Sequence, residues 1–112
     1  MKIIKWHEFE QVELRVGTIV VAEVFKEAHK PAYQLQVDFG EELGIKKSSA
    51  QITGLYSTDD LIGKQVVAVV NFPPKQIGPM MSECLVTGFH HKNNAVVLAV
   101  PDKSCENGVK LS

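Results

Sequence analysis

The sequence predicts an all-β domain, built as a five-stranded Greek-key barrel with one short helical turn and terminal extensions. Its apolar residues recur with a period of two, which is typical of strands that bury one face. Segments with this pattern follow one another about every dozen residues, as in sandwiches and closed barrels. A chain of 112 residues supports one hydrophobic core, so we expect residues 1–112 to form a single domain.

The first two strands carry the clearest alternation. Val12–Val16 alternates apolar and charged residues, Gly17 interrupts the pattern, and the apolar stretch Ile19–Val24 continues it. A glycine within a strand predicts a bulge or a sharp coil, which lets one strand serve both sides of a small barrel. Ala32–Phe39 alternates again and predicts a half-buried strand, and the proline of His29-Lys30-Pro31 favours a turn between the two strands.

The remaining elements follow from turn and capping signals. Ile45–Thr53 is expected to contain the third strand, and Ser57–Gly63 is expected to form one helical turn that Ser57 caps and Gly63 ends. Val66–Val70 is continuously apolar and predicts a strand buried on both faces, which the two prolines of Asn71–Lys75 interrupt. Further strands are expected at Glu83–Gly88, Ala95–Val100 and Val109–Leu111, with turns at His90–Asn94 and Asn107–Gly108.

Composition and charge indicate an ordinary globular protein. Apolar residues make up 45% and charged residues 22%, and the net charge is −1. The longest apolar run, Ala95–Val100, is far too short to span a membrane, and the charges in Met1–Glu8 interrupt any signal peptide, so we expect a cytoplasmic protein. Residues 43–82 carry four lysines and two aspartates, which permits a local phosphate-binding face.

No pattern in the chain predicts catalysis, a metal site or a cofactor. The four histidines lack ligand spacing, and His90 and His91 are expected to be surface turn residues. Cys84 and Cys105 are far apart, which favours reduced thiols, and in the expected strand Cys84 shares one face with Val86 and should be packed. There is no nucleophile elbow, phosphate-binding loop or dinucleotide fingerprint, so we expect a binding protein and no enzyme.

Gly44–Gln51 combines two cations, two hydroxyls and an amide in an expected strand. These groups suit phosphate and base-edge contacts with RNA, and Lys64, Lys75 and the ring of Phe72 could add charge and stacking. The same residues would also fit a solvated strand edge that lysines guard against aggregation. The chemistry of the segment alone leaves both interpretations open.

The loop Ile77–Met81 is apolar and carries two methionines. We expect Pro79 to stop a strand ladder here, so that the loop either plugs the core or presents an adaptable surface to a partner chain or an unfolded peptide. Because Ser82 and Glu83 follow at once, we expect at least one methionine to be presented to solvent.

Two segments of the chain are the most distinctive, Ser48-Ser49-Ala50-Gln51-Ile52 and Asn71-Phe72-Pro73-Pro74-Lys75. Further matching segments are Phe9–Ile19, Val37–Gly40, Gly44–Lys47, Lys64–Val70 and Ser82-Glu83, so that the match covers almost the whole chain in order. In these segments the chain resembles the CsaA family, small homodimeric proteins described as export-related chaperones and built on the tRNA-binding OB-fold domain. The chain departs from the family before Ser82, where relatives place a glycine and often a basic residue but this chain has Pro79-Met80-Met81.

The resemblance implies a cytoplasmic homodimer that binds tRNA or tRNA-like RNA and holds unfolded or export-bound proteins, without membrane insertion. On this hypothesis four lysines bind phosphates, five polar residues contact RNA and one aromatic ring stacks: Lys46, Lys47, Lys64, Lys75, Ser48, Ser49, Gln51, Asn71, Ser82 and Phe72. The alternative is a peptide-holding secretion chaperone with incidental RNA affinity, whose contacts would come from Phe72, Ile77, Met80 and Met81. The apolar terminal residues Ile3, Ile4, Trp6, Val109 and Leu111 are expected to cover a barrel edge or a partner.

Overall fold

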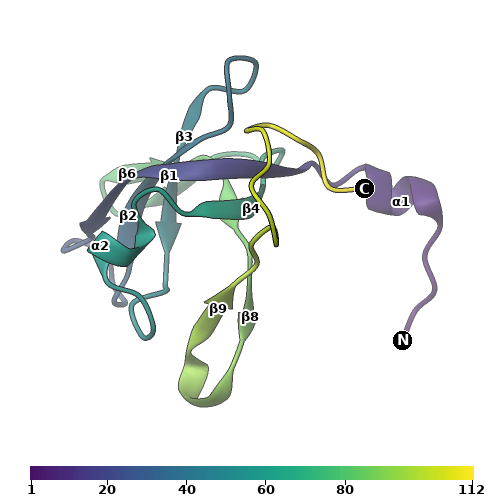
Figure 1. Ribbon diagram of the computed structural model, residues 1–112. Coiled ribbons are helices and arrows are strands. Elements are labelled where there is room, and N and C mark those ends of the chain that lie inside the picture. The colour runs from purple at the N-terminus through teal and green to yellow at the C-terminus, as the bar shows by residue number, and fades with distance from the viewer.

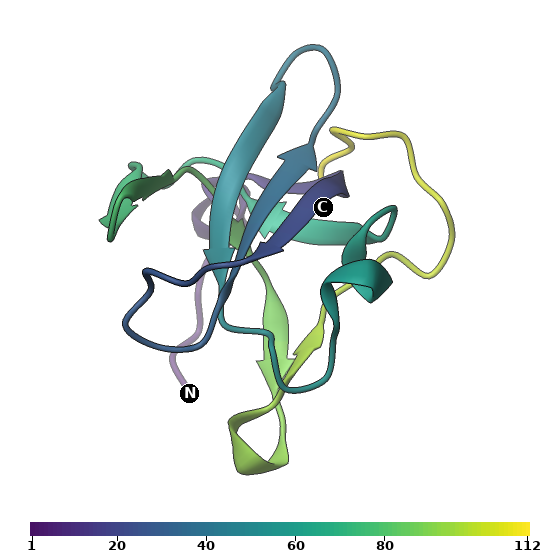
Figure 2. The ribbon, with the colours of Figure 1, turned by 90° about the vertical axis from the view of Figure 1, so that its left-hand side faces the viewer.

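The computed structural model describes residues 1–112 and is a nearly closed antiparallel barrel (Figures 1 and 2). Its five-stranded sheet has the order β3-β2-β1-β4-β7, and two small hairpins, β5–β6 and β8–β9, are attached to it. The elements are α1 (Trp6–Glu10), β1 (Leu14–Val24), β2 (Tyr33–Asp38), β3 (Ile45–Ala50), α2 (Thr58–Leu61), β4 (Gln65–Val69), β5 (Lys75–Ile77), β6 (Met80–Ser82), β7 (Leu85–Val86), β8 (Gly88–His90), a 3₁₀ turn η1 (Lys92–Asn94) and β9 (Val96–Leu98).

The long strand β1 serves both sides of the barrel, as its sequence predicted. Its first half pairs with β4 and its second half with β2, and the register shifts between Ile19 and Val21. Gly17 is not at this bulge. A β-carbon on Gly17 would lie 2.5 Å from Val37 and 2.7 Å from Phe39, so glycine is required there because two core side chains fill the space above it.

Hydrogen bonds between β3 and the segment before β7 bring the two ends of the sheet together. The backbone amide of Glu83 donates to the carbonyl of Lys47 at 2.7 Å, and the Ser48 hydroxyl donates to the carbonyl of Cys84 at 2.9 Å. The amide of Ser49 also donates to the Ser82 hydroxyl at 3.2 Å. These bonds satisfy polar groups that a strand edge would otherwise leave exposed, so the sheet is nearly closed into a barrel.

The core lies inside this barrel and follows the period-two pattern. In β2 the side chains of Tyr33, Leu35 and Val37 are buried, while the intervening polar residues are half-buried. The apolar run of β4 is buried from Val66 to Val69, which confirms the strand predicted to be covered on both faces. Thirteen buried residues form the main cluster: Ile19, Ala22, Tyr33, Leu35, Val37, Phe39, Ala50, Ile52, Leu61, Val66, Ala68, Cys84 and Leu98.

The helical turn α2 has the predicted start and end. The Ser57 hydroxyl accepts a hydrogen bond from the amide of Asp60 at 3.2 Å, and the Asp60 carboxylate accepts one from the amide of Ser57 at 3.0 Å. Those bonds from Ser57 hold the pKa of Asp60 below its ordinary value. Gly63, with φ of +88°, turns the chain into β4, and Leu61 anchors the turn in the core.

The second half of the chain differs from the sequence-based expectation. Pro79 does not stop a ladder: it lies in the turn of a hairpin in which Ile77 pairs with Met80 and Lys75 pairs with Ser82. The expected strand Glu83–Gly88 is divided, because residues 85–86 pair with β4 whereas residues 88–90 pair with β9 in a hairpin that projects from the barrel (Figure 1). The expected last strand, Val109–Leu111, forms only an isolated bridge between Lys110 and Arg15.

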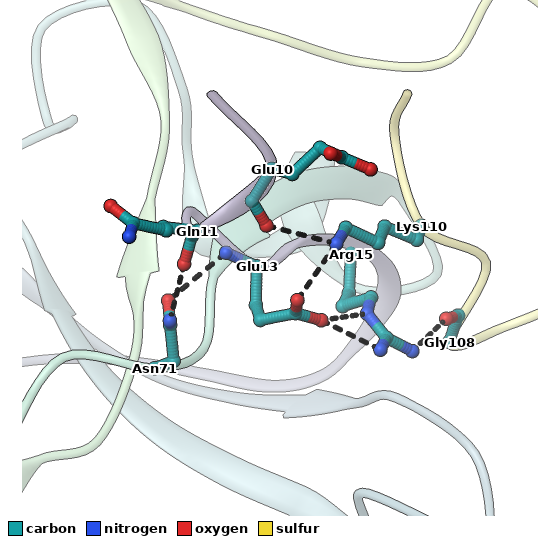
Figure 3. Close-up of polar contacts among 7 residues, drawn as sticks. All are labelled: Glu10, Gln11, Glu13, Arg15, Asn71, Gly108 and Lys110. Carbon is teal, nitrogen blue, oxygen red and sulfur yellow. Dashed lines mark hydrogen bonds and ion pairs between the residues drawn. The ribbon is translucent and has the colours of Figure 1, made fainter. Parts of the chain in front are cut away.

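The N-terminal helix α1 was not expected from the sequence and is tied to the barrel by polar contacts at its end. It buries none of its residues and stands away from the barrel beside the C-terminus (Figure 1). Glu13 accepts hydrogen bonds from Arg15 at 2.7 Å and Lys110 at 2.8 Å, and Lys110 also donates to the carbonyl of Glu10 at 3.1 Å (Figure 3). Both terminal segments are therefore held together at the start of β1.

The helices of this structure are too short and too polar for any of them to cross a membrane.

The Glu13 carboxylate predicts a pH dependence of stability. Hydrogen bonds from Lys110 and Arg15 lower its pKa, so its stabilising effect is present at neutral pH and is lost as the pH falls through the folded-state value. We expect Glu13→Gln to lower the melting temperature at neutral pH, and this difference from the wild type should shrink below about pH 5. Thermal melts across this range measure it, and a difference that does not vary with pH would contradict the assignment.

Candidate nucleic-acid interface

An open groove of about 800 Å³ runs between the end of β3, the segment after β4 and the segment that closes the barrel. It is lined by hydroxyl, amide, proline and aromatic side chains together with one lysine and one glutamate. The lining residues are Ser49, Gln51, Phe72, Pro73, Pro74, Lys75, Gln76, Ile77, Ser82, Glu83, Cys84 and Leu85. Five of the ten residues predicted to contact RNA therefore meet in one place: Ser49, Gln51, Phe72, Lys75 and Ser82.

Barrel closure positions the polar side of the groove. Ser49 lies on the outer face of β3 because its neighbours Ser48 and Ala50 point into the barrel. Its backbone amide donates to the Ser82 hydroxyl, which places the two serines side by side. Ser82 also pairs with Lys75, the first residue of β5, across the β5–β6 hairpin. This pairing fixes the backbone of Lys75 next to the segment that closes the barrel.

The apolar side of the groove is formed by the turn after β4. Phe72 is 55% exposed, and its ring is available to stack on a planar ligand. The adjacent Pro73 and Pro74 have no amide hydrogens and fixed φ angles, so they restrict the turn without leaving unpaired donors. An exposed aromatic ring beside one cation and several hydroxyl groups is an arrangement suited to a single-stranded nucleic acid.

The groove itself is nearly neutral. Lys75 is its only lining cation and Glu83 its only lining anion. The Glu83 carboxylate already accepts a hydrogen bond from the amide of Lys47 at 2.9 Å, so it is engaged in closing the barrel. Electrostatic attraction inside this groove is modest, and the groups that line it are suited mainly to stacking and hydrogen bonding.

The two adjacent lysines of β3 lie on opposite faces of the strand. Lys46 pairs with the fully buried Val37 and belongs to the inward row of Ser48, where it is half-buried at the end of the barrel. Lys47 is exposed on the outer face, two residues from Ser49, and lines a separate hollow of about 160 Å³ beside Met80. Only Lys47 thus shares a face with the groove.

Three further residues predicted to contact RNA lie outside the groove. Ser48 is 1% exposed and its hydroxyl bonds to the carbonyl of Cys84, which corrects the expectation that it faces a ligand. The side-chain amide of Asn71 donates to the carbonyl of Gln11 at 2.8 Å, and its oxygen accepts a hydrogen bond from the amide of Glu13 at 3.0 Å (Figure 3). Lys64 lies at the other end of β4, with its ammonium 5.9 Å from the centre of the Tyr56 ring.

Of the four residues predicted to hold a peptide, two line the groove and two do not. Phe72 and Ile77 line the groove. Met81 is 46% exposed, in agreement with the expectation that one methionine is presented. Met80 is 9% exposed and packs with Phe25 and Ala32 in a small second core, which corrects the expectation that it contacts a peptide.

Sequence reasoning missed six lining residues: Pro73, Pro74, Gln76, Glu83, Cys84 and Leu85. For Glu83 and Leu85 the signal was present, because the period-two pattern that places Cys84 and Val86 on the inner face directs these two side chains outward. Burial raises the pKa of the Cys84 thiol to about 11, which makes it unreactive at neutral pH. No three His, Cys, Asp or Glu side chains come together where they could hold a metal ion.

The closed five-stranded barrel and its groove define a binding module of the OB-fold class. Residues 14–110 match the family model described as "Putative tRNA binding domain", and the chain belongs to this tRNA-binding domain family. Within it, the chain is 50% identical to chaperone CsaA from Bacillus anthracis, with a TM-score of 0.93 over 99% of this chain and 100% of the other. It is 47% identical to the CsaA chaperone protein from Picrophilus torridus, with a TM-score of 0.91 over 98% and 100% of the chains.

Curated relatives include much longer enzymes. The chain is 38% identical to a methionine–tRNA ligase from Leptospira biflexa over 90% of this chain and 14% of that protein. It is 31% identical to the methionine–tRNA ligase of Thermococcus onnurineus over 99% of this chain and 15% of the ligase. The chain thus spans about one seventh of the length of these enzymes, and the matching family is a binding domain rather than a catalytic one.

The different environments of the two methionines predict opposite effects of the same substitution. Met80→Ser should cost about 2–5 kcal/mol of stability, because it empties part of a packed cluster and buries a hydroxyl. Met81→Ser should change the free energy of unfolding by less than about 0.5 kcal/mol, because its side chain is exposed. Denaturant unfolding of both variants measures this, and equal losses would mean that Met81 is also a core residue.

Proposed function

We propose that this protein binds tRNA or tRNA-like RNA through the groove beside β3, as a CsaA-like tRNA-binding OB-fold. The observation that carries the proposal is the meeting of Phe72, Lys75, Ser49 and Ser82 in one groove, where the Ser49 amide donates to the Ser82 hydroxyl. Phe72 stacks on a base, Lys75 binds a phosphate, and Gln51 with the two serines hydrogen-bonds to base edges or the backbone. Membership in the tRNA-binding domain family supports this choice of ligand.

The remaining predicted residues take different parts in this proposal. Lys47 contributes a phosphate contact next to the groove, because it is exposed on the same face as Ser49. Lys46 lies on the other face and Lys64 at the far end of β4, so neither contacts an RNA strand in the groove. Ser48 and Asn71 do not contact the RNA but support the groove. Ser48 helps to close the barrel, and Asn71 holds the turn that carries Phe72.

A second candidate function uses the same groove for an unfolded peptide. Its apolar lining, with Phe72, Ile77, Leu85 and two prolines, favours this function, and the CsaA proteins that the chain resembles are called chaperones. Met81 would extend the apolar surface on the other side of the β5–β6 hairpin. In this case export-bound or unfolded chains are the ligands and RNA affinity is incidental.

The assembly proposed is a homodimer in the cytoplasm, in which residues 1–112 act as one non-catalytic domain. Ile3 is 92% exposed and Trp6 is 62% exposed on an arm that buries none of its helix residues. Leu111 is also exposed, and the bond from Lys110 to the carbonyl of Glu10 holds the two apolar terminal segments next to each other. A second copy of the chain is the occupant that would remove this apolar surface from water.

RNA binding is tested by tRNA titrations of single variants at several salt concentrations. Lys47→Ala should reduce the slope of log affinity against log salt by about 0.7–0.9, because one phosphate contact is lost. Phe72→Ala should cost about 1–3 kcal/mol of binding free energy, the range of one stacked base. The matched control is Lys46→Ala, which removes the same charge from the opposite face of β3 and should leave the slope unchanged.

The same titration distinguishes the two candidate functions. Binding of a denatured protein through apolar contacts should change little or strengthen slightly with salt, whereas RNA binding should weaken steeply. If Lys46→Ala and Lys47→Ala have equal effects on tRNA binding, the groove is not the RNA site. If Phe72→Ala weakens only the binding of denatured protein, the peptide-holding function is the correct one.

The dimer is tested by light scattering at micromolar concentration. We expect the wild type to have twice the chain mass of 12.4 kDa. Trp6→Ser combined with Ile3→Ser should shift the protein toward the monomer mass without loss of the barrel, because both side chains lie outside the core. A wild-type protein that is monomeric under these conditions would refute the proposed assembly.

A further inference from the structure

A second open hollow, of about 990 Å³, lies between the β8–β9 hairpin, the loop before β2 and the loop after β3. The hairpin contributes His90, His91 and Lys92, and the loop before β2 contributes Lys30. All four side chains are exposed, and no part of the groove described above requires them.

The charge of this hollow differs from that of the whole chain. The chain has one more acidic than basic residue, yet the only titratable side chains that line the hollow are Lys30, Lys92, His90 and His91. No aspartate or glutamate lines it, whereas the groove has Glu83 beside Lys75. A concave surface that combines two lysines with neutral polar and apolar side chains, and has no acidic residue, suits a polyanion.

The hairpin has a defined backbone conformation around His90 and His91. His90 pairs with Val96 next to the hairpin tip, and its side chain is exposed. The amide of His91 donates to the carbonyl of Ala95 at 2.7 Å, and the turn is completed by Asn93 and Asn94 in the left-handed region.

The loop after β3 lies against the tip end of the hairpin, at Ala95. A β-carbon built on Gly54 would meet Ala95 at 3.9 Å, which is ordinary contact distance. Figure 2 shows this loop passing beside the β8–β9 hairpin. The hollow is therefore a surface between packed segments rather than a gap beneath a free loop.

The basic hollow is continuous with the groove through Gln51. Gln51 lines both of them, and it also lines a smaller hollow of about 260 Å³ that holds His29, Lys30 and Ser49. The smaller hollow shares Ser49 with the groove and Lys30 with the basic hollow, so the three surfaces adjoin one another. The smaller hollow has no acidic lining residue either.

We propose that the hollow beside the β8–β9 hairpin is a second phosphate-binding site, and that an RNA strand in the groove continues past Gln51 into it. This inference rests on the proposed RNA binding and extends the path of the ligand. OB-folds bind about 4–16 nucleotides of single strand, so a strand that covers both surfaces is within the usual range. The groove supplies stacking, and the hollow supplies the positive charge that the groove lacks.

The test uses fluorescence anisotropy with a labelled uridine oligomer of about 12 nucleotides, at one fixed pH and several salt concentrations. Lys30→Gln with Lys92→Gln should reduce the slope of log affinity against log salt by up to about 1.4, the loss of two single-strand phosphate contacts.

The matched control is Lys2→Gln with Lys103→Gln, which removes two lysines from exposed positions outside all three hollows. If the Lys30 and Lys92 variant behaves like this control while Phe72→Ala weakens binding, the second site is wrong and the groove proposal stands. If the wild type does not bind the oligomer at all, both proposals fail. A glutamate oligomer that displaces the RNA equally well would also overturn the inference, because the hollow would then be a general anion surface.

Discussion

The contact that closes the barrel, between β3 and the segment before β7, is the constraint on which the rest of the structure depends. The Ser48 hydroxyl reaches the carbonyl of Cys84, and Glu83 and Lys47 exchange two hydrogen bonds, one of them through the Glu83 carboxylate. Because these bonds use the polar groups of both edges, the sheet closes at five strands and encloses the core. Closure also brings Ser49 beside Ser82.

The function proposed for the groove follows from this closure. One wall consists of outward-facing residues of β3, and the other begins at Phe72, which the chain reaches only after crossing the barrel on β4. Asn71 fixes the start of the second wall by bonding to the backbone of Gln11 and Glu13 (Figure 3). The terminal segments and the groove are thus mechanically connected, although the terminal residues do not line it.

The distribution of charge explains how a chain with a net charge of −1 could hold RNA. The groove offers little net charge, and its ring and hydroxyl groups suit bases and sugars. Positive charge is concentrated instead on the hairpin side, where Lys30 and Lys92 line one hollow that has no acidic lining residue. Affinity and recognition would therefore come from neighbouring but different surfaces.

The sequence by itself determined the elements whose signals are local. Alternation in Tyr33–Asp38 defined both a strand and its buried face, the β-branched run of β4 defined a fully covered strand, and Ser57 and Gly63 marked the ends of α2. The outward orientation of Leu85 was also contained in this pattern. In these segments the residues that are buried are themselves strongly apolar, so a short window of sequence is sufficient.

Only the tertiary structure decided which residues of β3 face the groove. In Ile45–Ala50 the two apolar residues, at the ends of the strand, fall on opposite faces, so the alternation does not reveal which face is inside. Pairing with β2 and closure against residues 82–84 settle it, and they turn Lys47 outward and Ser48 inward. The two hollows are likewise built from segments tens of residues apart, whose meeting depends on pairing partners that no local pattern specifies.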